Sequence, residues 1–362
     1  MKIGIVGLPN VGKSTIFNAL TRSKKAATAA YAFCTIDPNV GVVTVPDKRL
    51  KTLTDIVHPE KVVPAVVEFV DIAGIVKGAS EGEGLGNQFL SHIRECDAIA
   101  EVIRFFEDEN VSHVGDGVNP MKDLETIQTE LILADLQTIQ KRLLKAKSDA
   151  KSGDKTKVAY AEILEKVFQT LDSGKLAHGS SLEEEEFEEL HDLHLLTMKP
   201  FLYIANVGET QLSNFNEKTL HEKTGISENY DIIPICAKLE EETAGLSEED
   251  ATELLKEYGL AETGLNHLIR TAYATLGLET YFTAGPQEVR AWTIPKGTKA
   301  AQAAGKIHTD FEKGFIKTEV TGFDEYVQCG GEQTAKEKGL VRQEGRDYLV
   351  KDGDVMYFRY NV

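Results

Sequence analysis

The feature that most constrains the fold of this chain is a glycine-rich segment near its N-terminus. Residues 7–14 read GLPNVGKS, which matches the pattern G-x-x-x-x-G-K-[ST]. The segment follows a short apolar run, Ile3–Val6, and precedes an amphipathic stretch, Ser14–Leu20. A strand, this loop and a helix in that order are typical of a phosphate-binding loop (P-loop), in which backbone N–H groups and the helix N-terminus surround a polyphosphate. The sequence therefore predicts a P-loop fold with a nucleotide site.

The predicted P-loop supplies six of the candidate ligands of the nucleotide. They are Asn10, Val11, Gly12, Lys13, Ser14 and Thr15. In a P-loop the lysine ammonium bridges the β- and γ-phosphates, so Lys13 is predicted to be catalytic, and the Ser14 hydroxyl is predicted to bind Mg²⁺. In K⁺-stimulated members of this superfamily an asparagine at the position of Asn10 helps to coordinate the cation, so K⁺ is a second expected cofactor.

Two further parts of such a site follow in chain order. Asp71 and Gly74 form a D-x-x-G motif directly after the apolar run Ala65–Val70. Asp71 is predicted to contribute to the Mg²⁺ site, and the Gly74 N–H is predicted to meet the γ-phosphate during catalysis. Thr35 lies between the two motifs and is predicted to close on Mg²⁺ when a γ-phosphate is present.

The residue after the D-x-x-G motif cannot orient an attacking water. Many P-loop switches carry glutamine there, whereas this chain carries Ile75, so slow intrinsic hydrolysis is expected. Two histidines are candidates for the missing role: His92 in a predicted helix, and His113 in a polar loop after the apolar run 98–106. Loops at the carboxyl ends of parallel strands face the ligand, so we predict that His113 is the catalytic histidine.

The base-binding site is expected after a long insertion. Residues 206–209 read NVGE where GTPases carry N-K-x-D, and residues 236–238 read CAK where they carry S-A-K. Glu209 places its carboxylate one methylene further out than aspartate, and Val207 lacks the lysine stem that covers the base. Both changes weaken strict guanine selectivity and leave ATP and GTP open as substrates. The predicted base-binding residues are Asn206, Val207, Glu209, Cys236, Ala237 and Lys238.

Periodicity and charge divide the chain into three predicted domains. Apolar runs alternate with helical patterns over residues 1–120 and 200–277, which predicts an α/β P-loop domain: a mostly parallel sheet with helices on both faces. Residues 121–199 have a long helical periodicity, which predicts an inserted α-helical hairpin; helices packed flat on the sheet are the alternative. Residues 278–362 hold 12 basic and 13 acidic residues and are predicted to form a small α+β domain, in which Leu349–Phe358 is a β-hairpin.

Composition restricts the setting in which the chain works. The formal net charge of the 362 residues is −18, so contact with nucleic acid requires a local basic patch. The tip of the predicted hairpin is such a patch, with a solvated helix face as the alternative; its basic residues are Lys141, Arg142, Lys145, Lys147, Lys151, Lys155 and Lys157. Four dispersed cysteines without a C-x-x-C pair and the lack of a long uncharged apolar run favour a cytoplasmic protein without membrane contact. We also expect a monomer.

Taken together, these motifs resemble the YchF family, the Obg-like ATPases of the Obg-related branch of translation-factor GTPases. The resemblance covers essentially the whole chain. It is carried by GLPNVGKS, by NVGE, by the run DIAGIVKGASEGEGLGNQFL at residues 71–90, and by AWTIPKGT with AAGKIHTDFEKGFI, which resemble a TGS domain. The resemblance implies an ATPase rather than a strict GTPase, with N-x-x-E linked to that preference. It also implies association with ribosomes in translation and stress responses.

The main hypothesis is therefore a ribosome-associated P-loop ATPase that hydrolyses ATP, with GTP as a second substrate. The basic hairpin tip and the TGS-like domain are its candidate contacts with ribosomal RNA. Two other functions stay open: a GTP-specific switch, and a nucleotide-gated RNA- or ribosome-binding module whose hydrolysis is incidental. A metabolic kinase would need a site for an acceptor substrate, and the sequence offers no motif for one.

Overall fold

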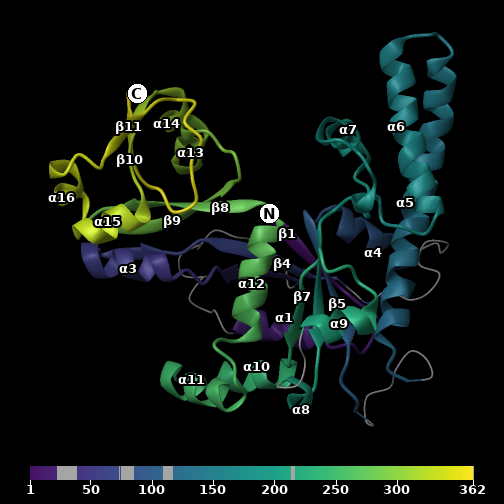
Figure 1. Cartoon of the computed structure of the whole chain (residues 1–362), viewed down its shortest axis with the longest axis horizontal. Helices are drawn as coiled ribbons and strands as arrows, with labels where there is room; N and C mark the ends of the chain where they lie inside the picture. The colour runs from purple at the N-terminus through teal and green to yellow at the C-terminus, as the bar shows by residue number, and fades with distance from the viewer. Residues whose placement is uncertain (23–38, 73, 75–84, 109–116, 213–216, 362) are drawn as a thin grey trace. The chain divides into compact units, whose positions relative to one another are not determined.

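The computed structural model describes residues 1–22, 39–72, 74, 85–108, 117–212 and 217–361 (Figure 1). These residues form two compact units. One contains the described residues of 1–22, 39–41 and 68–268, and the other contains residues 42–67 and 269–361. Each unit is considered by itself below.

The predicted P-loop belongs to a six-stranded sheet in the order β2-β4-β1-β5-β6-β7. Its strands are β1 (Lys2–Val6), β2 (Val40–Thr44), β4 (Val66–Asp71), β5 (Ala98–Arg104), β6 (Phe201–Asn206) and β7 (Ile232–Ile235). β1 pairs in parallel with both β4 and β5, and parallel pairing continues through β6 to β7. The carboxyl ends of these strands therefore lie along one edge, where Asp71 ends β4 and Asn206 ends β6.

Helices follow these strands in the chain. They are α1 (Lys13–Arg22), α4 (Leu85–Arg94), α8 (Glu209–Leu212), α9 (Glu217–Thr224), α10 (Ala237–Thr243), α11 (Glu248–Glu257) and α12 (Gly264–Thr275). Every residue of β5 and of β6 is buried, as expected for strands that are covered on both faces of a parallel sheet. In α1 the buried side chains, Ile16, Phe17 and Leu20, recur at helical spacing. The predicted α/β P-loop fold is confirmed.

The insertion forms the predicted helical hairpin. Its helices are α5 (Pro120–Ala150), α6 (Lys155–Asp172) and α7 (Glu184–Glu189), with short 3₁₀ turns η1 (Ala177–Gly179) and η2 (His191–Leu193). α5 and α6 run side by side (Figure 1) and share a core that includes Ile139, Leu143, Leu164 and Val167. Among the described helices none is long and apolar enough to cross a membrane.

A buried carboxylate ties α5 to the segment that leads into β6. Asp135 is 1% exposed and accepts hydrogen bonds from the backbone N–H groups of Leu196 (3.0 Å) and Thr197 (2.7 Å). The Thr197 hydroxyl also donates to it at 2.6 Å. Burial nevertheless raises the pKa of Asp135, against these hydrogen bonds. This contact fixes the chain just before the strand that carries Asn206.

The second unit contains a six-stranded sheet in the order β11-β10-β12-β8-β9-β3. Its strands are β3 (Lys61–Val63), β8 (Leu278–Ala284), β9 (Glu288–Pro295), β10 (Phe315–Thr321), β11 (Arg342–Glu344) and β12 (Val355–Tyr360). Its helices are α3 (Lys48–Val57), α13 (Ala300–Ile307), α14 (Thr309–Lys313), α15 (Phe323–Cys329) and α16 (Glu332–Glu337). The predicted P-loop domain included residues 42–67, whereas the structure groups them with residues 269–361. Within this unit β3 pairs in parallel with β9, and α3 packs on β8 and β9. The three-domain division stays a prediction.

The predicted β-hairpin at residues 349–358 is wrong. Only Val355–Tyr360 is a strand there, and it pairs with β10 and β8 rather than with the residues before the turn. Asp352 in the turn accepts a hydrogen bond from the Thr280 N–H at 2.8 Å and forms an ion pair with Arg49 at 2.6 Å. These partners lie far away in the chain, so the local turn pattern carried no information about them.

Candidate nucleotide-binding site

The loop between β1 and α1 has the backbone that a P-loop requires. Asn10 and Gly12 have positive φ values of 63° and 98°, a region that favours glycine and tolerates asparagine. A Cβ atom at Gly12 would lie 2.1 Å from the Asn206 amide nitrogen. Any larger residue at position 12 would therefore collide with Asn206 as well as strain the backbone.

Lys13 begins α1 and turns its ammonium group back into the loop. Nζ donates to the carbonyl oxygens of Gly7 and Leu8, both at 2.8 Å, and the residue is only 7% exposed. Burial lowers the pKa of Lys13 to about 8, while the charge of Asp71 acts in the opposite direction. The ammonium group is thus enclosed by the loop that would surround a phosphate chain.

Ser14 and the D-x-x-G motif meet the P-loop at the same edge of the sheet. The Ser14 hydroxyl donates to a carboxylate oxygen of Asp71 at 3.1 Å. Burial raises the pKa of Asp71, against the hydrogen bond from Ser14 and the charge of Lys13. Gly74 is exposed, and a Cβ atom there would lie 3.0 Å from Lys13 Nζ. Four predicted residues from two separate motifs therefore lie together.

This set of residues fits a Mg²⁺ ion that is held mainly by its substrate. Ser14 and Asp71 offer two oxygen ligands, which Mg²⁺ prefers, and Mg²⁺ commonly takes only one or two protein ligands beside phosphate and water. Within the described ranges no cluster of three or more His, Cys, Asp or Glu side chains is arranged to hold a metal ion.

Asn206 connects three loops at the base-binding end of the site. Its side-chain nitrogen donates to the Val11 carbonyl at 2.8 Å, and its side-chain oxygen accepts from the Ala237 N–H at 3.5 Å. Its backbone carbonyl accepts from the N–H groups of Phe105 (2.8 Å) and Phe106 (3.2 Å). Asn206 is 3% exposed. Its buried side-chain amide links the P-loop to the loop at residues 236–238.

The two charged residues predicted to read the base contact each other. Glu209 begins α8, and its carboxylate lies 2.6 Å from the ammonium group of Lys238, the second residue of α10. The hydrogen bond from Lys238 to Glu209 raises the pKa of the lysine. Val207 is 2% exposed, and Cys236 and Ala237 are also buried. The side chain of Val207 packs inside the fold, where it cannot cover a base as a lysine stem would.

Gln211, which none of the motifs includes, also stabilises the NVGE loop at residues 206–209. Gln211 accepts a hydrogen bond from the Gly208 N–H at 2.8 Å and donates to the Phe105 carbonyl at 3.2 Å. It thereby joins the NVGE segment to the residues after β5. The pattern N-x-x-E ends before Gln211, so its role is evident only from the tertiary contact.

Several predicted residues cannot be compared with this geometry. Thr35, Ile75 and His113 lie outside the described residues. Thr15 is half-buried in the first turn of α1, and His92 is exposed on α4. The described residues bring the phosphate-binding loop and the base-binding loops together. The roles of Thr35 and His113 stay predictions.

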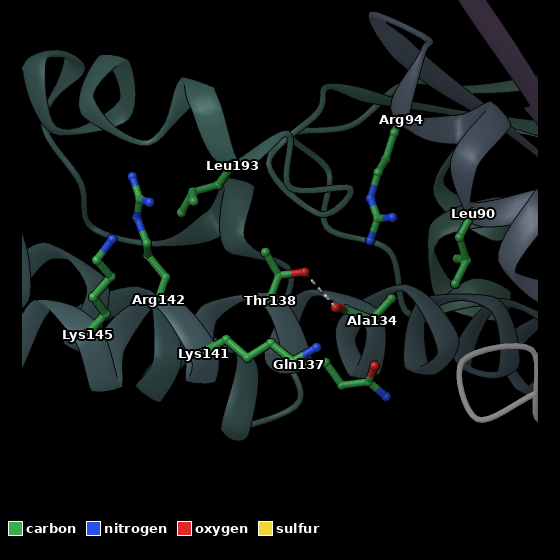
Figure 2. Close-up of a pocket in the computed structure, with 9 residues that line it drawn as sticks. All are labelled: Leu90, Arg94, Ala134, Gln137, Thr138, Lys141, Arg142, Lys145 and Leu193. Atoms are coloured by element: carbon green, nitrogen blue, oxygen red, sulfur yellow. Dashed lines mark hydrogen bonds between the residues drawn. The ribbon is translucent and has the colours of Figure 1, made fainter.

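The basic residues of the hairpin differ in their surroundings. Arg142 pairs with Asp192 at 2.8 Å and Lys147 with Glu165 at 2.5 Å. Arg142 also lines a groove of about 510 Å³ with Lys141, Lys145 and Arg94 of α4 (Figure 2). None of the described residues that line this groove is acidic. Lys151, Lys155 and Lys157 are exposed at the tip.

The parallel sheet, the loop around Lys13 and the Ser14–Asp71 contact define a P-loop nucleoside triphosphatase fold of the GTPase type. Comparison with known protein families supports the same class of protein. A family model described as "50S ribosome-binding GTPase" matches residues 2–135, and the model YchF-GTPase_C, "Protein of unknown function (DUF933)", matches residues 278–361.

Whole-chain relatives identify the family. The chain is 53% identical to a protein of Bacillus subtilis (strain 168) named "Ribosome-binding ATPase YchF", with 99% of each chain covered. It is 51% identical to the protein of that name from Escherichia coli O157:H7, covering 100% of this chain and 99% of the relative. The solved structure of the Schizosaccharomyces pombe YchF GTPase has a TM-score of 0.89 at 38% identity, covering 99% of this chain and 97% of the other. The chain therefore belongs to the YchF family, as its motifs suggested.

Proposed function

We propose that this chain hydrolyses ATP at its P-loop, accepts GTP as a second substrate, and acts as a ribosome-associated switch. The observation that carries the proposal is the meeting of Lys13, Ser14, Asp71 and Gly74 at one edge of the sheet. The relatives named ribosome-binding ATPases support the choice of substrate and partner. GTP-specific hydrolysis, or a nucleotide-gated binding module, is the competing function.

Each residue of the site has a distinct part in this mechanism. Lys13 supplies positive charge to the β- and γ-phosphates, and with a pKa of about 8 it is mostly protonated at neutral pH. Ser14, Asp71 and Thr35 would hold Mg²⁺, which when bound neutralises negative charge on the phosphate oxygens. The Gly74 N–H would donate a hydrogen bond to the γ-phosphate. Asn10 is the proposed ligand of a K⁺ ion at the same phosphates.

The proposal is tested by measuring phosphate release and nucleotide affinity on the full chain. We expect ATP and GTP both to bind with Mg²⁺, ATP to be hydrolysed slowly, and EDTA to stop hydrolysis. Hydrolysis of GTP alone would favour the GTP-specific switch. Nucleotide-dependent ribosome binding without turnover would favour the binding module. If neither nucleotide binds, the proposed function is wrong.

Replacing His113 with alanine is expected to slow single-turnover hydrolysis by about 10²-fold, because a positioned acid–base or water-orienting group contributes about 10²–10⁴. The dissociation constant of ATP should change little, since the histidine acts on the attacking water. Rapid-mixing phosphate release measures the rate, and calorimetry measures the affinity. His92→Ala is the matched control, and an unchanged rate in His113→Ala would remove His113 from the mechanism.

The contacts with the ribosome are proposed at two places. Lys141, Arg142 and Lys145, with Arg94, line the cationic groove, and the exposed tip adds further ammonium groups. Contacts of this kind with ribosomal RNA phosphates would weaken as salt concentration rises. The second proposed contact is the TGS-like region at residues 278–361. Ribosome binding would place the protein in the cytoplasm, and we propose that it acts as a monomer.

A further inference from the structure

The ion pair in the base-binding loops suggests how the site chooses its purine. We propose that Lys238 is a specificity-determining residue: by pairing with Glu209 it occupies the carboxylate that would otherwise select guanine, and so admits adenine. This inference rests on the proposed nucleotide site and deepens it. It assigns to Lys238 a role that the N-x-x-E pattern by itself does not contain.

The loops that carry the two residues are held close together by the fold. β6 and β7 are parallel neighbours, and the Val207 N–H donates to the Ile235 carbonyl at 2.9 Å. The contact between the Asn206 side chain and the Ala237 N–H adds a second link. Lys238 directly follows Ala237, and Glu209 lies two residues after Val207. Their charged atoms lie 2.6 Å apart. The pair is therefore set by the backbone of both loops.

The chemistry of the two purines explains why this pair matters. A free carboxylate at the base site accepts hydrogen bonds from the N1–H and 2-amino groups of guanine. Adenine has neither donor, so it would leave such a carboxylate without a partner, at a cost in free energy. When Lys238 already satisfies Glu209, adenine no longer incurs that cost, and guanine must compete with the ammonium group. The preference for guanine is thereby lost.

The exposure of the pair limits the size of the effect. The Lys238 side chain is 72% exposed and that of Glu209 is 35% exposed. Exposed ion pairs are weak, so breaking this one is expected to shift the relative affinities by only about threefold to fivefold. Calorimetry resolves a change of that size when both nucleotides are measured on the same protein.

The experiment measures dissociation constants of Mg-ATP and Mg-GTP on the full chain and on three variants. Lys238→Met keeps an apolar stem but removes the charge, and it should lower the ratio of the GTP constant to the ATP constant about threefold to fivefold. Glu209→Gln removes the carboxylate, and adding Lys238→Met to it should produce no further shift. Lys218→Met is the control, because Lys218 pairs with Glu222 in α9, an exposed pair away from the base loops. Thermal unfolding checks that each variant is folded.

The outcomes separate this inference from the proposed function. If both nucleotides bind and Lys238→Met leaves their ratio unchanged, the role of Lys238 is wrong and the nucleotide site stands. The role is also wrong if Lys238→Met shifts the ratio equally in the Glu209→Gln background, since the effect would not pass through Glu209. If the unaltered chain binds neither nucleotide, the inference and the proposed function fail together.

Discussion

Replacing Lys13 with alanine is expected to reduce ATP hydrolysis by about 10²–10³-fold and to weaken ATP binding. The ammonium group is buried in the P-loop, where it donates hydrogen bonds to the Gly7 and Leu8 carbonyls. Alanine would leave this position without a positive charge. Loss of one preorganised group that stabilises transition-state charge commonly costs a factor of this size. Single-turnover phosphate release and calorimetry on the full chain measure the two effects.

The matched control is Asn18→Ala, which changes an exposed residue of the same helix. It should leave both hydrolysis and binding near the values of the unaltered chain. Burial lowers the pKa of Lys13 to about 8, so binding of ATP to the free protein should also weaken as pH rises from 7 to 9. Hydrolysis within tenfold of the unaltered rate in Lys13→Ala would contradict the role of this residue.

Replacing Glu101 with glutamine is expected to stabilise the protein at neutral and alkaline pH. Glu101 lies in β5 with no exposed surface, and within the described residues neither carboxyl oxygen has a hydrogen-bond partner. Burial, and secondarily the charge of Asp123, raises the pKa of Glu101 well above its ordinary value. The folded state therefore retains a proton that the unfolded chain has already released, and stability falls as pH rises above about 4.5.

Glutamine is similar in shape and carries no charge, so the variant lacks this loss. Its advantage in unfolding free energy should grow by roughly 1 kcal/mol per pH unit until the folded protein also ionises. Urea unfolding from pH 5 to pH 8 measures the difference. Glu125→Gln, at an exposed position of α5, is the control and should show no such trend. A constant difference between Glu101→Gln and the unaltered chain would show that the carboxyl group is not the cause.

The phosphate-binding residues of the P-loop could be predicted from the sequence because they lie close together in the chain. Strand, loop and helix follow one another within residues 2–22, so the spacing of Gly12, Lys13 and Ser14 already implies their geometry. Asp71 required one further step: β4 had to be placed next to β1, and the alternation of strands and helices implied such a parallel sheet. The helical hairpin was also predictable, because its helices are long and their apolar residues recur at helical spacing.

The base end was only partly predictable. The motif located Glu209 and Lys238 but could not show that they pair, because 29 positions of sequence separate residues that neighbouring strands bring within 2.6 Å. Gln211 carried no signal at all. In the second unit, β3 and the segment at Asp352 have partners that lie more than 70 residues away in the chain. The local turn pattern therefore predicted the wrong pairing for residues 349–358.

By itself, the sequence of this protein determined the α/β class, the P-loop and the family, because each depends on the order and spacing of nearby residues. Only the tertiary structure decided which partners the charged and amide side chains take: Asn206 links three loops, Asp135 binds the segment before β6, and Lys238 pairs with Glu209. The physical reason is that a side chain's hydrogen bonds depend on distances between distant segments, which are set when the strands pair and the core packs.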